Sequence, residues 1–230
     1  MSLEALKRPF SARALPGLLV VLIPILEFLG VGYKMACART AMSGNYELPQ
    51  WKNWKQLLIF GAKVRFIQLI WLTPAIITFV LLFYKIKSLA SASAQTIVAL
   101  PQLFAIRNIL IIFFVLLVVA AIFAPACILN YIAEARFKAA FSFSVLRRML
   151  SKAYLIGWLA AGLYAVIAVA VLLGFFFLIS GFVQTASPVL LSIAVLPVEL
   201  IMFWLPGITY WTLLGEYWGK SISREYRSTL

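Results

Sequence analysis

The sequence predicts an all-α integral membrane helical bundle, and three observations support this class. Hydrophobic residues make up 64% of the 230 residues and the mean hydropathy is +1.03, whereas soluble domains are about half apolar. Several uncharged apolar runs reach the roughly 18–20 residues that cross a bilayer. Basic residues gather in the connectors beside these runs, which is the pattern of positive-inside orientation.

The charge balance narrows the function classes. Net charge is +13, from 20 Lys and Arg against seven acidic residues, all of them Glu. Because the charges lie beside apolar spans, they indicate attraction to anionic lipid headgroups and not to nucleic acid. The chain has no His and no Asp, which removes histidine-based catalysis and the usual metal sites. We therefore expect no enzyme activity, catalytic residue, cofactor or metal site.

The N-terminal part begins with a polar segment, residues 1–14, which has a basic bias and could form a short interfacial helix. A first hydrophobic segment follows from Leu15 to Tyr33. Its prolines and glycines suit either a spanning helix or a re-entrant hairpin. A cleaved signal peptide is not expected, because Glu27 interrupts the apolar stretch and Lys34 follows it.

The connector over residues 34–65 is basic and bears two tryptophans. Glu47-Leu48-Pro49 predicts a helix start, with an acid near the N-terminus and a proline in the first turn. Trp51 and Trp54 would then share one face of an interfacial amphipathic helix, with their indoles at headgroup level. The alternative is a well-anchored loop.

Two further spans are predicted in the middle of the chain, Phe66 to Tyr84 and Ile109 to Tyr131. Between them, residues 88–107 contain a small, polar loop sequence and then an apolar stretch that is too short to cross. After them, residues 132–153 form a second basic connector. We predict a second interfacial amphipathic helix there, with Glu134 and Lys138 as an i, i+4 ion pair.

The last third predicts one long span from Tyr154 to Phe182 and a return span from Pro188 to Trp211. These segments give four full spans plus the first re-entrant or spanning segment, so four or five transmembrane segments in all. We expect a single transmembrane domain over residues 15–218 and a polar C-terminal tail over residues 219–230.

Charge also predicts the orientation. If the 34–65 and 134–152 connectors and the C-terminus are cytoplasmic, most of the Lys and Arg residues lie inside. A re-entrant first segment leaves only Lys85, Lys87 and Arg107 outside, so it is mildly favoured over a spanning one. The expected location is the plasma membrane.

One combination of motifs resembles a known family. An LIPIL run (residues 22–26) precedes Gly32-Tyr33 and Arg39, then Glu47-Leu48-Pro49 with Trp51 and Trp54, and then Gly61 and Lys63. With the second basic connector, this pattern resembles the multi-pass membrane family called domain of unknown function 4013, over roughly residues 15–215. Glu27 departs from it, because a neutral polar residue is expected there. The resemblance implies the architecture and the plasma membrane of a prokaryote as the location, and it implies no activity.

Two groups of residues are candidates for function. Glu27 and Glu199 are the only acids within hydrophobic segments, where a carboxylate is costly and by default suggests a functional site. Each could instead be protonated or solvated near an interface. The second group comprises interfacial anchors and headgroup contacts at the two connectors: Trp51, Trp54, Lys52, Lys55, Lys63, Arg147, Arg148 and Lys152.

Two functions remain open at this point. The first is a non-enzymatic membrane protein that organises the bilayer or scaffolds partners. The alternative is a small transporter or channel subunit that uses Glu27 and Glu199 as a midplane site. Expected partners are membrane lipids with anionic headgroups, and a homo-oligomer or another membrane protein is possible.

Overall fold

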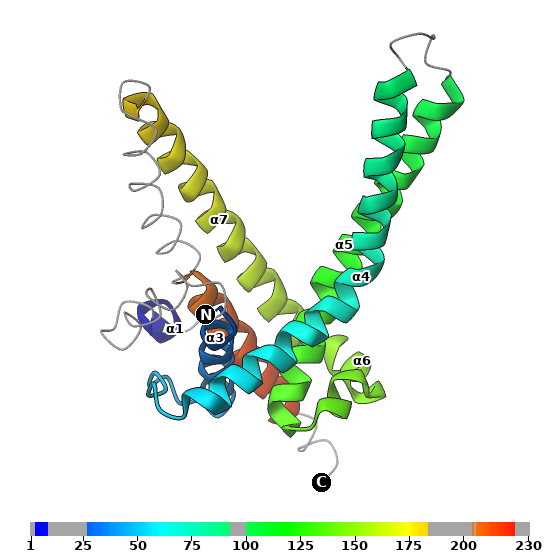
Figure 1. The fold of residues 1–230 in the computed structure, drawn as a ribbon. Helices are drawn as coiled ribbons and strands as arrows, with labels where there is room; N and C mark the ends of the chain where they lie inside the picture. The colour runs from blue at the N-terminus through cyan, green and yellow to red at the C-terminus, as the bar shows by residue number, and fades with distance from the viewer. Residues whose placement is uncertain (1–2, 9–26, 93–99, 184–203, 205, 224–230) are drawn as a thin grey trace. The chain divides into compact units, whose positions relative to one another are not determined.

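The computed structural model describes residues 3–8, 27–92, 100–183, 204 and 206–223. Every regular element in these residues is helical (Figure 1), which confirms the all-α class. Three helices are long and apolar enough to cross a membrane, and between 17% and 22% of their most apolar stretches is buried. Most of their apolar surface therefore faces outward. The three are Trp54–Leu89, Phe104–Glu134 and Lys152–Val171.

The chain divides into two compact units. Unit 1 comprises Met1–Arg65 and Leu129–Leu230, and unit 2 is Phe66–Ile128. Helix α4 (Trp54–Ala92) and helix α5 (Leu100–Glu134) each begin or end in one unit and continue in the other.

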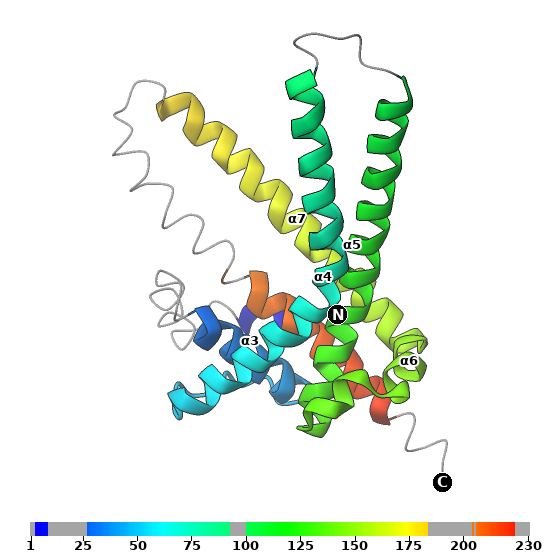
Figure 2. The same cartoon turned by 45° about the vertical axis from the view of Figure 1, so that its right-hand side comes forward.

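Unit 2 is an antiparallel hairpin of α4 and α5, which run side by side in both views (Figures 1 and 2). Trp71 stacks on Phe123 with ring centroids 5.0 Å apart, and Phe79 meets Phe113 at 5.7 Å. Along α4, the buried Ala75 lies between these two contacts. Small residues let helix backbones approach closely in apolar surroundings, where packing rather than water drives association.

Unit 1 is built around helix α3 (Glu27–Met42). The helix over residues 206–223 crosses it closely, because a Cβ on Gly215 would lie 2.3 Å from the Ala38 carbonyl oxygen. Helix α7 (Lys152–Val183) packs on the same C-terminal helix, where Tyr154 and Trp218 meet edge to face at 5.2 Å. Both of these rings are fully buried.

The predicted helix start at Glu47 is wrong, because α4 begins at Trp54. Backbone carbonyl groups of Tyr46 and Glu47 accept hydrogen bonds from the Arg8 guanidinium, which holds this stretch as a loop. Asn53 then adopts φ 60° and its carbonyl accepts the first hydrogen bonds of α4, from Gln56 N and Leu57 N. The alternative of an anchored loop therefore describes residues 45–53.

The predicted loop sequence and the short apolar stretch after it, residues 88–107, are both helical where the structure describes them, at residues 88–92 and 100–107. Helix α4 continues to Ala92, and α5 begins at Leu100. Pro101 lies in the first turn of α5, where a missing backbone N–H costs no hydrogen bond. This proline therefore starts a long helix, whereas the sequence pattern placed it inside a separate short stretch.

The second connector is not one continuous helix. Helix α5 ends at Glu134, and Ala135 has a φ of 55°. A 3-10 helix, η4 (Phe137–Phe141), and the short helix α6 (Phe143–Met149) follow. Because the chain turns here, Glu134 pairs with Arg148 at 3.0 Å and not with Lys138 as predicted.

Other expectations have mixed outcomes. The long span predicted from Tyr154 to Phe182 agrees with α7. Helix α3 continues past the predicted segment end at Tyr33 to Met42. Glu199 and most of the return span, Pro188 to Trp211, lie outside the described residues, as does most of the first hydrophobic segment.

Candidate functional site

Helix α3 and the first turns of α4 cross at two glycines of unit 1. A Cβ on Gly32 would lie 2.0 Å from the Leu57 carbonyl oxygen, and one on Gly61 would lie 1.8 Å from the Phe28 carbonyl oxygen. No side chain larger than hydrogen fits at either place without moving the backbone. The two helices therefore touch at their backbones, and the groups beside the crossing are held at short range.

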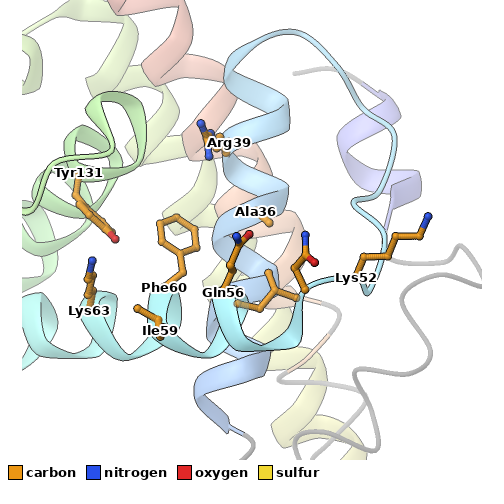
Figure 3. A pocket seen from close by; sticks show the side chains of 10 residues that line it. Ala36, Arg39, Lys52, Gln56, Ile59, Phe60, Lys63 and Tyr131 are labelled. Atoms are coloured by element: carbon orange, nitrogen blue, oxygen red, sulfur yellow. The ribbon is translucent and has the colours of Figure 1, made fainter.

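A pocket of about 350 Å³ lies beside this crossing (Figure 3). Helix α3 contributes Ala36 and Arg39, and the loop between α3 and α4 contributes Lys52. Helix α4 contributes residues of its first turns as far as Lys63. Tyr131, from the end of α5 that belongs to unit 1, stands at the Lys63 end in Figure 3, with Phe60 between Lys63 and Gln56.

The pocket is basic. Arg39, Lys52 and Lys63 line it, and none of its lining residues carries a carboxylate. All three side chains are exposed, and no ion pair is recorded for them among the described residues. Asn53 and the first turn of α4 add the positive end of a helix, where the first backbone N–H groups have no partner within the helix. The site is therefore suited to an anion.

The pocket also has an apolar part, formed by Leu57, Ile59 and Phe60. Ile59 is 44% exposed, so apolar surface lies directly beside the cations. The neighbouring Trp54 is 52% exposed, and its indole N–H donates to the Trp51 carbonyl oxygen at 2.8 Å. Charged and apolar surfaces side by side, next to an exposed indole, are typical of contact with an amphiphile.

The loop that carries Lys52 is fixed at its start by Arg8. This side chain is 4% exposed and donates to the carbonyl oxygens of Cys37 and Tyr46, each at 2.8 Å, and to Thr212 Oγ1 at 3.3 Å. All of these acceptors are neutral. Burial lowers the pKa of the Arg8 guanidinium from its ordinary value. Arg8 therefore joins the N-terminal segment, α3, the 43–53 loop and the C-terminal helix.

The loop is fixed at its other end by stacked rings. Trp51 lies on Tyr33 with ring centroids 4.1 Å apart and planes 8° from parallel, and Trp204 lies 6.1 Å from Trp51. The Lys34 amine lies 5.0 Å from the centre of the Trp204 ring. Burial lowers the pKa of Lys34 from 10.5 to about 8. Because Trp51 precedes α4, it does not share a helical face with Trp54 as predicted.

The predicted basic groups divide differently in the structure. Lys52 and Lys63 line the pocket, but Lys55 does not. Arg39 also lines the pocket, although it is not among the predicted site residues. Its signal was helical spacing: Gly32, Ala36 and Arg39 lie at i, i+4 and i+7, so the crossing glycine and the arginine share one face.

The second basic group serves internal contacts at Arg148. Its guanidinium donates to Asn130 Oδ1 and to Glu134 Oε1. Asn130 is fully buried and donates in turn to the Ala139 carbonyl oxygen at 2.7 Å. Arg148 therefore fixes the turn between α5 and α6, whereas Arg147 and Lys152 are exposed.

Of the two candidate acids, only Glu27 can be placed. It forms an ion pair with Arg65, and half of its side chain is exposed. Glu27 begins α3 and Arg65 lies on α4, so the pair lies on the two helices that cross at the glycines. In the described part of the chain, no group of three or more His, Cys, Asp or Glu could hold a metal ion.

Comparison with protein families decides the relationship. The model of the family described as Protein of unknown function (DUF4013) matches residues 15–181. The chain belongs to this family. The matched region contains every residue that lines the pocket, together with the α3–α4 crossing and the connector at Arg148. Comparison with curated proteins and with solved structures gives no match. The DUF4013 family brings no established activity.

Proposed function

We propose that this DUF4013 member is a non-enzymatic multi-pass protein of a prokaryotic plasma membrane that organises the bilayer or scaffolds partners. Its 34–65 and 134–152 connectors and its C-terminus lie on the cytoplasmic side in this proposal. The basic pocket beside Trp54 would then contact anionic headgroups of the inner leaflet, in agreement with the positive-inside rule.

The observation that carries the proposal is that polar side chains of the long apolar helix α4 hydrogen-bond to carbonyl groups of the same helix. Thr73 Oγ1 donates to the Leu69 carbonyl oxygen at 2.7 Å, and Thr78 Oγ1 donates to the Pro74 carbonyl oxygen at 2.8 Å. These hydroxyls form their hydrogen bonds within their own helix. The outward side chains around them are apolar, for example Ile77 and Leu81. Such surfaces favour contact with lipid over movement of a polar solute.

The transporter alternative depends on Glu27 and Glu199. Glu27 is already neutralised by Arg65, so it offers no uncompensated charge for a cation or a proton. This pairing favours the scaffold over the transporter.

The test is reconstitution of the full chain in liposomes, with ion flux and vesicle shape measured on the same sample. We expect changed vesicle shape or lipid organisation without flux, and the same result with Glu27→Gln and Glu199→Gln. Ion flux that Glu199→Gln abolishes would overturn the scaffold proposal. Vesicles that show neither flux nor any change in shape or lipid order would also overturn it.

A further inference from the structure

We propose that the pocket between α3 and the start of α4 is a specific site for an anionic phospholipid, with Arg39 and Lys63 holding its phosphate. This inference deepens the proposed function, because it names the ligand class of the basic surface.

The charge of the pocket selects an anion. Arg39 comes from α3, Lys52 from the loop and Lys63 from the third turn of α4, so three cations from separate segments border one cavity that lacks a lining carboxylate. Like charges that share a cavity repel one another, and a bound anion relieves this repulsion. Each basic residue near a surface adds about 1 kcal/mol of attraction to anionic lipid.

Arg39 adds directed donors. Its guanidinium can bind two phosphate oxygens at once, which a lysine cannot do. Gln56 also lines the pocket, and its side-chain amide can donate to an anion. The guanidinium of Arg39 and the amine of Lys63 together match a phosphodiester.

The apolar part of the pocket separates a lipid from free phosphate. Inorganic phosphate gains nothing from the exposed Ile59 or from Leu57 and Phe60, whereas the glycerol and upper acyl region of a phospholipid would cover them. A volume of about 350 Å³ suits a headgroup and not a whole lipid, so the chains would extend past Ile59. The exposed Trp54 indole has the preference for headgroup depth that this arrangement requires.

The geometry also supplies a matched control. Lys55 lies on α4, as Lys63 does, and is exposed, but it does not line the pocket. Lys55→Gln and Lys63→Gln remove the same charge from the same kind of residue eight positions apart. If lipid binding is non-specific attraction to positive charge, both variants should weaken it equally. If the pocket is the binding site, only Lys63→Gln of these two variants should weaken it.

The experiment is native mass spectrometry of the delipidated full chain in detergent, titrated with phosphatidylglycerol, phosphatidylcholine or inorganic phosphate. We expect phosphatidylglycerol to bind in preference to phosphatidylcholine. Arg39→Gln and Lys63→Gln should each weaken phosphatidylglycerol binding about fivefold, the equivalent of about 1 kcal/mol per cation. Lys55→Gln should change it less than twofold. Gln56→Glu, which keeps every cation and places a carboxylate in the pocket, should weaken it at least as much.

Several outcomes would overturn the site. Equal losses with Lys55→Gln and Lys63→Gln would mean surface attraction only. Equal binding of the two lipids would mean that charge is not recognised, and competition by millimolar inorganic phosphate would mean a free-anion site. Thermal unfolding of each variant, followed by circular dichroism, separates misfolding from lost binding. Selective binding in a protein that leaves vesicles unchanged would keep the site and reject only the bilayer-organising function.

Discussion

Unit 1 and unit 2 use opposite means to stay folded. Unit 1 buries polar groups and joins several of them in networks: Arg8 binds several neutral acceptors, and Asn130 links the Ala139 carbonyl to Arg148. Thr209 Oγ1, Glu216 Oε2 and Trp218 Nε1 are buried there without a hydrogen-bond partner among the described residues. Unit 2 joins two helices through rings such as Phe79 and Phe113 and leaves most of its large apolar side chains exposed. A buried polar network is specific but fails sharply when one partner is lost, whereas apolar contacts are lost gradually. The following variants test this contrast.

The largest effect is expected at the glycine crossing of unit 1. Gly32→Val places side-chain atoms where a Cβ alone would be 2.0 Å from the Leu57 carbonyl oxygen, so the helices must separate. We expect a loss of about 3 kcal/mol or more, or loss of the folded state. Gly162→Ala on α7 is the control, because nothing lies within 4 Å of its Cβ position. It should stabilise the chain by about 0.5–1 kcal/mol. Unfolding in mixed micelles measures both, and equal effects would contradict the crossing.

Arg8→Met tests the polar network next. The apolar side chain keeps much of the volume but removes the donor to the Tyr46 carbonyl and to Thr212 Oγ1. The Cys37 carbonyl loses one donor and keeps Thr40 Oγ1. Each buried group left unsatisfied costs about 1–3 kcal/mol, and partial access of water limits the total, so we expect a loss of about 3 kcal/mol. The same micelle assay measures it. Lys7→Met, a neighbouring exposed cation, should cost less than about 0.5 kcal/mol. A cost for Lys7→Met equal to that for Arg8→Met would show that general charge, and not the network, stabilises unit 1.

These two sites also show what the sequence could and could not reveal. Long uncharged runs mark α7 and the hairpin helices, because apolar length alone decides a span. The start of α4 depends on Arg8, which lies 38 residues before Tyr46 in the chain, and no local pattern contains that contact. The sequence predicts part of the pocket. The positive charges of the connector identify Lys52 and Lys63, which line it. Charge alone also includes Lys55, which lies on α4 but does not line the pocket. Arg39 becomes a neighbour only through the crossing at Gly32 and Gly61.

Lys34 gives unit 1 a dependence on pH. Its pKa is about 8 in the folded chain against an ordinary value of 10.5, with burial as the cause. Between these two values the Lys34 amine binds more protons in the unfolded chain than in the folded chain, so its contribution to stability rises with pH over this window and is flat below it. Burial raises the pKa of the Cys37 thiol to about 12 in the folded chain, so ionisation of this thiol in the unfolded chain lowers stability as the pH rises, but equally in wild type and in Lys34→Met. We expect wild type to gain about 2 kcal/mol relative to Lys34→Met from pH 8 to 10.5, measured by unfolding in buffered micelles. A constant difference across the window would reject the buried amine.

The smallest effect is expected in unit 2. Phe79→Ala removes the ring that meets Phe113 at 5.7 Å, and aromatic pairs contribute about 0.5–1.5 kcal/mol beyond the area they bury, so we expect a loss of about 1 kcal/mol in the micelle assay. Leu81→Ala is the matched control, because Leu81 is about as exposed as Phe79, 57% against 52%, but forms no ring contact with α5.

The Leu81 control also tests what covers the exposed face of the hairpin. If lipid covers it, Leu81→Ala should cost less than about 0.5 kcal/mol, and its cost should not depend on protein concentration. If a second copy of the chain covers it, truncation leaves a gap in a packed interface, so the cost should approach that of Phe79→Ala and grow as the protein is concentrated. The second result would make the exposed apolar surface of unit 2 a protein interface, and the contrast between the two units would then apply only to the isolated chain.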